Sequence, residues 1–192
     1  MSWLREEVDP VVQRQRLAFE KEQAGVLAMR QPLTPEQTYR LFGTFLGLLP
    51  PLALFDRFLT ESKGEQSFWV VALCVAMNIV CCLVGRWIGG RLGLWAGDPR
   101  RRTRVRYAFV VLAMAFAWSF VTGALGGAVF FIIGAFFGVL IATPVALVAF
   151  PAFAILHRLI SRGGMIDARH AWSLAFGIPL TIAALISSPW IK

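Results

Sequence analysis

Charged residues are scarce in this chain. Asp, Glu, Lys and Arg make up 16% of its 192 residues, whereas an ordinary soluble domain contains roughly 25%. Hydrophobic residues make up 57%, and the mean hydropathy is +0.65. So few polar side chains cannot cover a protein surface in water, and the composition therefore indicates an integral membrane protein.

Cysteine is also rare. The three cysteines, Cys74, Cys81 and Cys82, lie in one apolar run, without CxxC spacing and without a nearby histidine. This pattern excludes a disulfide framework and a zinc site. We expect buried thiols that act as small apolar groups. Acylation of Cys81 or Cys82 near a membrane face is the alternative.

Catalytic and transport signatures are missing. The sequence has no GxSxG motif, HExxH motif or phosphate-binding loop, no repeated halves of a transporter fold and no ionisable side chain near the middle of a predicted span. His157 and His170 flank a loop that contains Asp167. We expect interfacial histidines there, with acid–base catalysis by these three residues as the alternative. The sequence therefore predicts no enzyme, no cofactor and no metal.

The apolar runs predict the fold. A membrane helix needs about 20 apolar residues. Residues 107–157 contain no Asp, Glu, Lys or Arg and would be about 76 Å long as one helix, so they must form a hairpin. Glycine-rich residues 122–127 are the strongest turn signal in this run. We predict an all-α integral membrane protein of about five transmembrane helices in one bundle, with spans at about 38–59, 66–86, 106–122, 127–157 and 171–190.

The first span is the shortest apolar run. Only 15 residues separate Arg40 from Asp56, and Pro50-Pro51 should kink the helix, so a re-entrant segment is the alternative. Thr34-Pro35-Glu36-Gln37 predicts a capped helix start, because Thr34 and Gln37 have the spacing of a capping box. We expect Asp56 and Arg57 in the headgroup layer at the other end.

Basic residues predict the orientation. The arm through Arg40 contains six Lys/Arg, segment 56–67 two, segment 86–106 seven, the turn between the third and fourth spans none, segment 158–170 three and the tail one, which places 16 of 19 on one side. The positive-inside rule makes that side cytoplasmic, so the N-terminus should be inside and the C-terminus outside. Residues 1–33 should form a polar cytoplasmic arm, partly helical, before the bundle at 34–192. The first forty residues lack an apolar run, so we expect no cleavable signal peptide.

Glycines four residues apart recur along the predicted helices. Such spacing lets two helix backbones approach closely in lipid. Packing within the bundle and packing against another subunit both explain the pattern. The candidate helix-packing residues are Gly43, Gly47, Gly85, Gly89, Gly93, Gly123, Gly127, Gly134 and Gly138.

Two further features concern contact with lipid headgroups and a polar side chain within a predicted span. The basic segment 100–106 should contact anionic headgroups, unless it only determines topology. Nucleic acid is not an expected partner because no aromatic stacking platform is interleaved. Segment 85–97 should extend the second span into the interface. Asn78, deep within that span, should bond a backbone carbonyl or Ser119, with a substrate contact as the alternative. The candidate anionic-lipid contacts are Arg100, Arg101, Arg102, Arg104 and Arg106.

These observations leave two functional hypotheses. The first is a non-enzymatic membrane subunit or scaffold that packs through its Gly-xxx-Gly faces as a homo- or hetero-oligomer. The second is a small transporter, channel or lipid-handling protein with a proline-bent cavity that Asn78, Ser119 and Thr143 would line. The prolines concerned are Pro50, Pro51, Pro144, Pro151 and Pro179. The expected location is the cell membrane, with the inner membrane of a bacterium as the simplest case.

Overall fold

The computed structural model describes residues 32–61, 68–96, 103–161 and 164–188, and the side chains of Leu59, Glu61 and Arg104 are not described. The chain divides into two units, Met1–Pro32 and Leu33–Lys192. Apart from its last two residues, the predicted polar arm at 1–33 lies outside the described residues. The second unit contains all the described helices.

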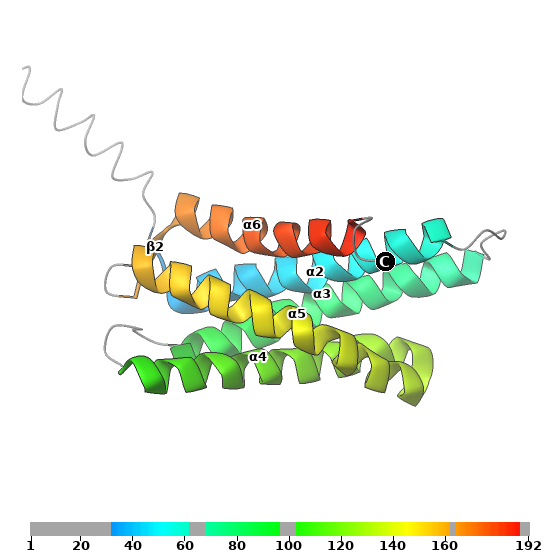
Figure 1. Ribbon diagram of the computed structural model, residues 1–192, viewed down its shortest axis with the longest axis horizontal. Coiled ribbons are helices and arrows are strands. Elements are labelled where there is room, and N and C mark those ends of the chain that lie inside the picture. The colour runs from blue at the N-terminus through cyan, green and yellow to red at the C-terminus, as the bar shows by residue number, and fades with distance from the viewer. Residues whose placement is uncertain (1–31, 62–67, 97–102, 162–163, 189–192) are drawn as a thin grey trace, which may run out of the picture. The chain divides into compact units, whose positions relative to one another are not determined.

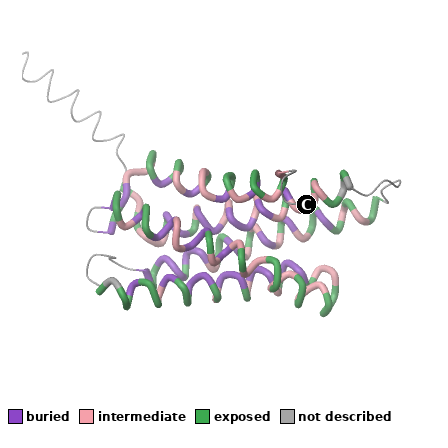
Figure 2. The backbone as a smooth tube through the Cα atoms, in the orientation of Figure 1, coloured by how far each residue is buried: buried purple, intermediate pink, exposed green. Residues whose placement is uncertain are grey.

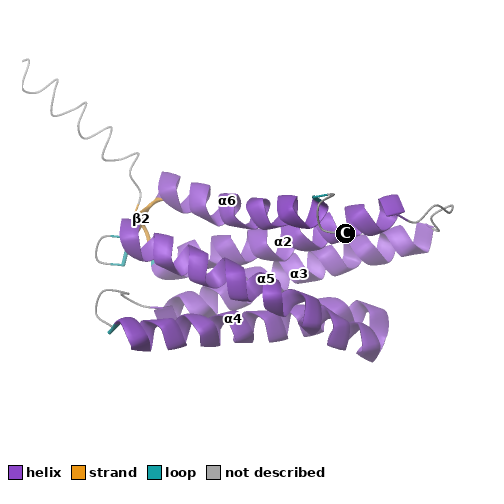
Figure 3. Ribbon diagram, in the orientation of Figure 1, coloured by secondary structure: helices purple, strands orange, loops and turns teal. Residues whose placement is uncertain are grey.

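Apart from one short strand pair, the regular structure in the described part of the second unit is helical (Figures 1 and 3). Its helices are α2 (Pro35–Glu61), α3 (Phe68–Ala96), α4 (Arg104–Gly127), α5 (Phe131–Ile160) and α6 (Ala168–Ser187). A short 3-10 helix, η2 (Ala128–Phe130), joins α4 to α5, and the two-residue strand β1 (Pro32–Leu33) pairs with β2 (Ile166–Asp167).

Within the described residues, four helical stretches are long and apolar enough to span a membrane. They are Pro35–Phe58, Phe68–Ala96, Val105–Ile160 and Ala168–Ser187. The third is 56 residues long and contains both α4 and α5. The helical fold and its apolar stretches agree with the predicted class of membrane protein.

The turn between α4 and α5 lies later in the chain than predicted. The sequence favours a turn over 122–127, but α4 continues through Gly127, and the chain reverses at η2 and Phe131. Phe131 has a φ of 66°, which is uncommon for a residue other than glycine. Gly123 and Gly127 face α5 from within α4 instead of forming the loop.

Other boundaries extend beyond the predicted spans. The helix α2 is continuous over 27 residues and contains Pro50 and Pro51. Its capping box is confirmed, because the Thr34 N–H donates to Gln37 Oε1 at 3.0 Å and the Gln37 N–H donates to Thr34 Oγ1 at 3.3 Å. The helix α3 continues to Ala96, ten residues past the predicted span end at 86, in agreement with the expected extension of this span through segment 85–97.

Neighbouring helices in the chain run antiparallel. Gly43 of α2 faces Gly85 of α3, and Gly93 of α3 faces Pro35 and Glu36. In the same way, Gly123 and Gly127 of α4 face Gly138 and Gly134 of α5. Figure 1 shows that the first residues of α2, α4 and α6 share one end of the bundle with the last residues of α3 and α5.

That end, here called the basic end, contains most of the described arginines. They are Arg40, Arg86, Arg91, Arg106, Arg158 and Arg169. At the far end Arg57 donates to the Ile186 carbonyl of α6 at 3.2 Å, while Asp56 is exposed. The helix directions therefore bring together basic residues that are separated in sequence.

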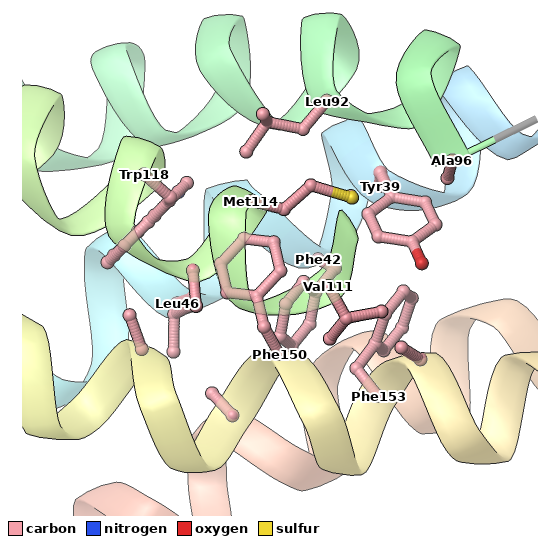
Figure 4. Packing of buried hydrophobic residues seen from close by; sticks show 14 of the residues in the cluster. Tyr39, Phe42, Leu46, Leu92, Ala96, Val111, Met114, Trp118, Phe150 and Phe153 are labelled. Atoms are coloured by element: carbon pink, nitrogen blue, oxygen red, sulfur yellow. The ribbon is translucent and has the colours of Figure 1, made fainter. Parts of the chain in front are cut away.

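Aromatic side chains fill the space between α2 and α5 (Figure 4). The ring of Phe42 stacks on that of Phe153 with centroids 4.0 Å apart and meets that of Phe150 edge-on at 5.3 Å. Tyr39 meets Phe153 edge-on at 5.1 Å, and Trp118 of α4 lies 6.0 Å from Phe150. This aromatic layer joins the α2–α3 hairpin to the α4–α5 hairpin. Outward faces of the helices remain exposed (Figure 2), as expected for surfaces in contact with lipid.

Candidate functional site

A cavity of about 720 Å³ lies between α4 and α5 near the basic end, and we call it the α4–α5 groove. Its buried floor is formed by Tyr107, Val111 and Ala154, and the exposed residues of its rim are apolar. The lining residues are Tyr107, Ala108, Val111, Leu112, Pro151, Ala154, Ile155, Arg158 and Leu159.

The groove exists because α4 and α5 meet closely only near their connecting turn. A Cβ built on Gly123 would lie 2.6 Å from the Gly138 carbonyl oxygen, so the backbones touch there. Toward the basic end no glycine pair among the described residues faces across, and the two ribbons diverge (Figure 1). The Tyr107 side chain bridges the wider gap, with its hydroxyl donating to the Ala154 carbonyl at 3.2 Å. The small side chains of Ala108 and Ala154 leave the remaining space open.

One charged side chain lines the groove. The Arg158 Cζ lies 5.0 Å from the centre of the Tyr107 ring, within the range of a cation–π contact. Among the residues that the structure describes, no carboxylate pairs with Arg158. The groove therefore combines apolar walls open to the side of the bundle with a cation at the basic end.

The predicted acid–base residues do not form an open site. His157 is buried, and its ring packs against Tyr39 at 5.6 Å and Phe153 at 6.0 Å. Neither of its nitrogens has a hydrogen-bond partner among the described residues. His170 is exposed on α6, and Asp167 is half-buried. No cluster of three or more metal-ligating side chains occurs in the described segments.

The nine predicted packing glycines all face backbone within the chain. Those of α2 and α3 face one another's helix, with Gly47 against Cys81 and Gly89 against Tyr39, and those of α4 and α5 do the same. A Cβ on any of them would overlap the opposite backbone or, at Gly134, also the Phe130 side chain. These glycine faces are therefore occupied inside the bundle.

The predicted lipid-contact arginines and the three cysteines differ in how far they are buried. Arg100, Arg101 and Arg102 lie outside the described residues, and Arg106 is exposed in the first turns of α4. The thiols of Cys74 and Cys81 are buried and that of Cys82 is half-buried, and all three are free. The expected buried thiols are therefore confirmed for the first two.

The polar residues expected along a cavity make helix contacts, although Thr143 also lines a cavity of about 510 Å³ formed by residues of α5 alone. Asn78 donates to the Leu48 carbonyl at 3.1 Å, which confirms the predicted bond to a backbone carbonyl. Thr143 donates to the Val139 carbonyl at 2.7 Å and lies 3.4 Å from Ser119 Oγ. Of the prolines, Pro151 lines the α4–α5 groove and Pro144 lines the cavity at Thr143. The sequence interpretation missed Tyr107 and Arg158, whose only signal was their place near the two ends of the uncharged run.

Comparison with protein-family models, with curated proteins and with solved structures finds no match to this chain. A functional assignment therefore depends on the geometry of the bundle and its grooves.

Proposed function

We propose that the chain crosses the membrane five times, with the basic end in the cytoplasm. The stretch Val105–Ile160 would be about 84 Å long as one straight helix, whereas a hydrocarbon core is about 30 Å thick. Because α4 and α5 run antiparallel, each can cross once. The grouping of arginines at one end supports the orientation. Reporter fusions at residues 97 and 192 should report opposite sides of a cell membrane. The same side for both would contradict five crossings.

We further propose a non-enzymatic, lipid-binding membrane protein that holds an anionic phospholipid in the α4–α5 groove. The observation that carries this proposal is the guanidinium of Arg158, without a carboxylate partner among the described residues, at the basic end of an apolar groove open to the side. A phospholipid matches this arrangement, because its anionic phosphate can lie beside the guanidinium while its acyl chains contact the apolar walls.

Selectivity must come mainly from the phosphate. An acyl chain gains little hydrophobic free energy by moving from bilayer to protein, because both surroundings are equally apolar. A basic residue near an anionic headgroup contributes about 1 kcal/mol. We therefore expect the groove to prefer anionic over zwitterionic lipid about five-fold, instead of binding any lipid tightly.

Native mass spectrometry of the protein released from nanodiscs tests this proposal. Nanodiscs with equal phosphatidylglycerol and phosphatidylcholine should release protein that retains phosphatidylglycerol. Arg158→Gln should reduce that retention about five-fold, and Ala108→Phe should reduce it by filling an exposed part of the groove. Arg169→Gln, an exposed arginine of α6 at the same end, is the matched control. Equal losses in Arg158→Gln and Arg169→Gln would refute a specific groove.

A role as a membrane subunit or scaffold stays a prediction. Its glycine faces are filled within the bundle, so an oligomer would have to use other surfaces. Exposed apolar residues at the start of α5, including Phe131 and Ile132, and Phe68 and Trp69 at the start of α3 are available for such contacts at the far end. Measurement of the particle mass in mild detergent, with and without added lipid, distinguishes the two roles. An oligomer is expected for a subunit or scaffold, and a monomer that binds lipid is expected for the lipid-binding protein.

A further inference from the structure

A second cavity, of about 380 Å³, lies between α2 and α3 at the basic end and shares no lining residue with the α4–α5 groove. We call it the arginine pocket. Three of its lining side chains are guanidinium groups, those of Arg40, Arg86 and Arg91, and one is the carboxylate of Glu36. The sequence interpretation assigned lipid contact to segment 100–106, and none of these four residues belongs to it.

Glycine on α3 makes room for the pocket. The helices approach closely at Gly89 and Gly93, where a Cβ would lie 2.5 Å from the Tyr39 carbonyl oxygen and 2.7 Å from the Pro35 carbonyl oxygen. At Gly90 the nearest atom is Arg40 Nε, 3.1 Å from the position of a Cβ. The Arg40 side chain therefore lies across the bare backbone at Gly90. Arg86 is one turn before this glycine on the same helix face.

The pocket has an excess of positive charge. Arg40 Nη2 lies 2.7 Å from Glu36 Oε1, so this carboxylate neutralises one of the three guanidinium groups. No described carboxylate pairs with Arg86 or Arg91. The Arg91 Cζ lies 5.9 Å from the centre of the Trp87 ring, which holds this guanidinium along the exposed side of α3. Two guanidinium groups are thus left to bind an external anion.

The depth of the pocket matches a phosphate layer. Trp69 and Trp87 are both exposed on α3, and their separation of 18 positions corresponds to about 27 Å of helix, close to the hydrocarbon thickness of about 30 Å. Tryptophan is enriched at both membrane interfaces. Arg86 and Arg91 lie on either side of Trp87, at the level where headgroups begin.

We propose that the arginine pocket binds the phosphate group of an anionic phospholipid. Guanidinium groups bind phosphate oxygens through paired hydrogen bonds, and the exposed side chains of Leu83 and Leu94 provide apolar contact beside the charged groups. These flanking residues favour a lipid over a soluble phosphate ester, although the recognised group is the same. The site is independent of the α4–α5 groove.

Binding of short-chain phosphatidylglycerol to detergent-purified protein tests the proposal. The double variant Arg86→Gln/Arg91→Gln should weaken binding at one site about 25-fold, at about five-fold for each guanidinium. Arg158→Gln should leave this site unchanged, so failure of the pocket and failure of the groove are distinguishable. Arg169→Gln is again the control for a general loss of charge.

A second variant blocks the pocket without removing charge. Gly90→Leu places a side chain against the flexible Arg40 side chain instead of backbone, so folding should be retained while phosphatidylglycerol binding falls. Competition by millimolar glycerol 3-phosphate or inorganic phosphate would support a phosphate site with a soluble ligand and overturn the assignment to lipid. Unchanged phosphatidylglycerol binding in both pocket variants would overturn the site itself, as would an equal loss in Arg169→Gln.

Discussion

The α2–α3 hairpin and the α4–α5 hairpin both pack through close backbone contacts at glycines, but at opposite ends of the bundle. In α2–α3 the glycine contacts extend from Gly47 to the start of α2, in the basic half. In α4–α5 they are next to the turn, in the far half. The described residues in the basic half of α4–α5 make no glycine contact, and there the helices separate and the groove opens. The position of the glycines along a hairpin thus determines where a lateral groove can form.

Substitution of Phe42 tests the aromatic layer that joins the two hairpins and should give the largest loss of stability. Phe42→Ala removes a fully buried ring that contacts both Phe150 and Phe153. A core Phe→Ala change costs about 3–5 kcal/mol. Thermal unfolding in detergent should show this loss. Leu52→Ala, on an exposed part of the same helix, should have little effect, and equal losses would argue against the aromatic layer.

The glycine contacts should show the next largest effect. Gly43→Ala places a methyl group onto the Gly85 carbonyl, and overpacking of this kind costs about 1–3 kcal/mol. Gly177→Ala is the matched control, because nothing lies within 4 Å of a Cβ at that position of α6 and alanine favours the helix by roughly 0.5–1 kcal/mol. Stability should fall in the first variant and hold or rise in the second. A similar response in both would mean that α2 and α3 do not touch at Gly43.

Some local features of the two hairpins could be predicted from the sequence. Two signals worked, because a capping box is decided by neighbouring residues and a buried amide in a membrane helix must find a hydrogen-bond partner. Thr34 and Gln37 bond as their spacing indicates, and Asn78 finds a backbone carbonyl. The predicted turn was wrong because glycine has two uses in a membrane helix, in loops and in close packing, and only the partner helix decides between them.

The α4–α5 groove could not be predicted because it depends on helix register. The expected turn at 122–127 is centred six residues before the midpoint of the facing pair Gly127 and Gly134. Moving a hairpin turn by six residues shifts every partner by twelve. With the expected turn, Tyr107 would have faced position 142 instead of Ala154. The arginine pocket depends in the same way on the register of α2 against α3.

Alanine substitutions at Asn78 and Thr143 compare the side-chain hydrogen bonds between the helices of the two hairpins. Asn78→Ala removes a bond between α3 and the α2 backbone, and interhelical bonds in membranes contribute about 0.6 kcal/mol on average and up to about 1.7 kcal/mol. Thr143→Ala should cost less, because Thr143 lies 3.4 Å from Ser119 and also bonds its own helix at Val139. Unfolding in a denaturing detergent measures both losses. A larger loss at Thr143 would reverse the ranking.

Tyr107→Phe should have a small effect on stability and the most specific effect on the groove. The change keeps the ring beneath Arg158 and removes only the hydroxyl that donates to the Ala154 carbonyl. Stability should fall by about 1 kcal/mol or less, because a single hydrogen bond between membrane helices contributes no more than that on average. Without the hydroxyl, α4 and α5 lose a hydrogen bond across the groove floor, so phosphatidylglycerol retention should fall while binding at the arginine pocket stays unaffected. Tyr107→Ala, which also removes the ring, should lower both stability and retention further. If Tyr107→Phe weakened both lipid sites equally, the two hairpins would be acting as one unit, and the separation between groove and pocket would be lost.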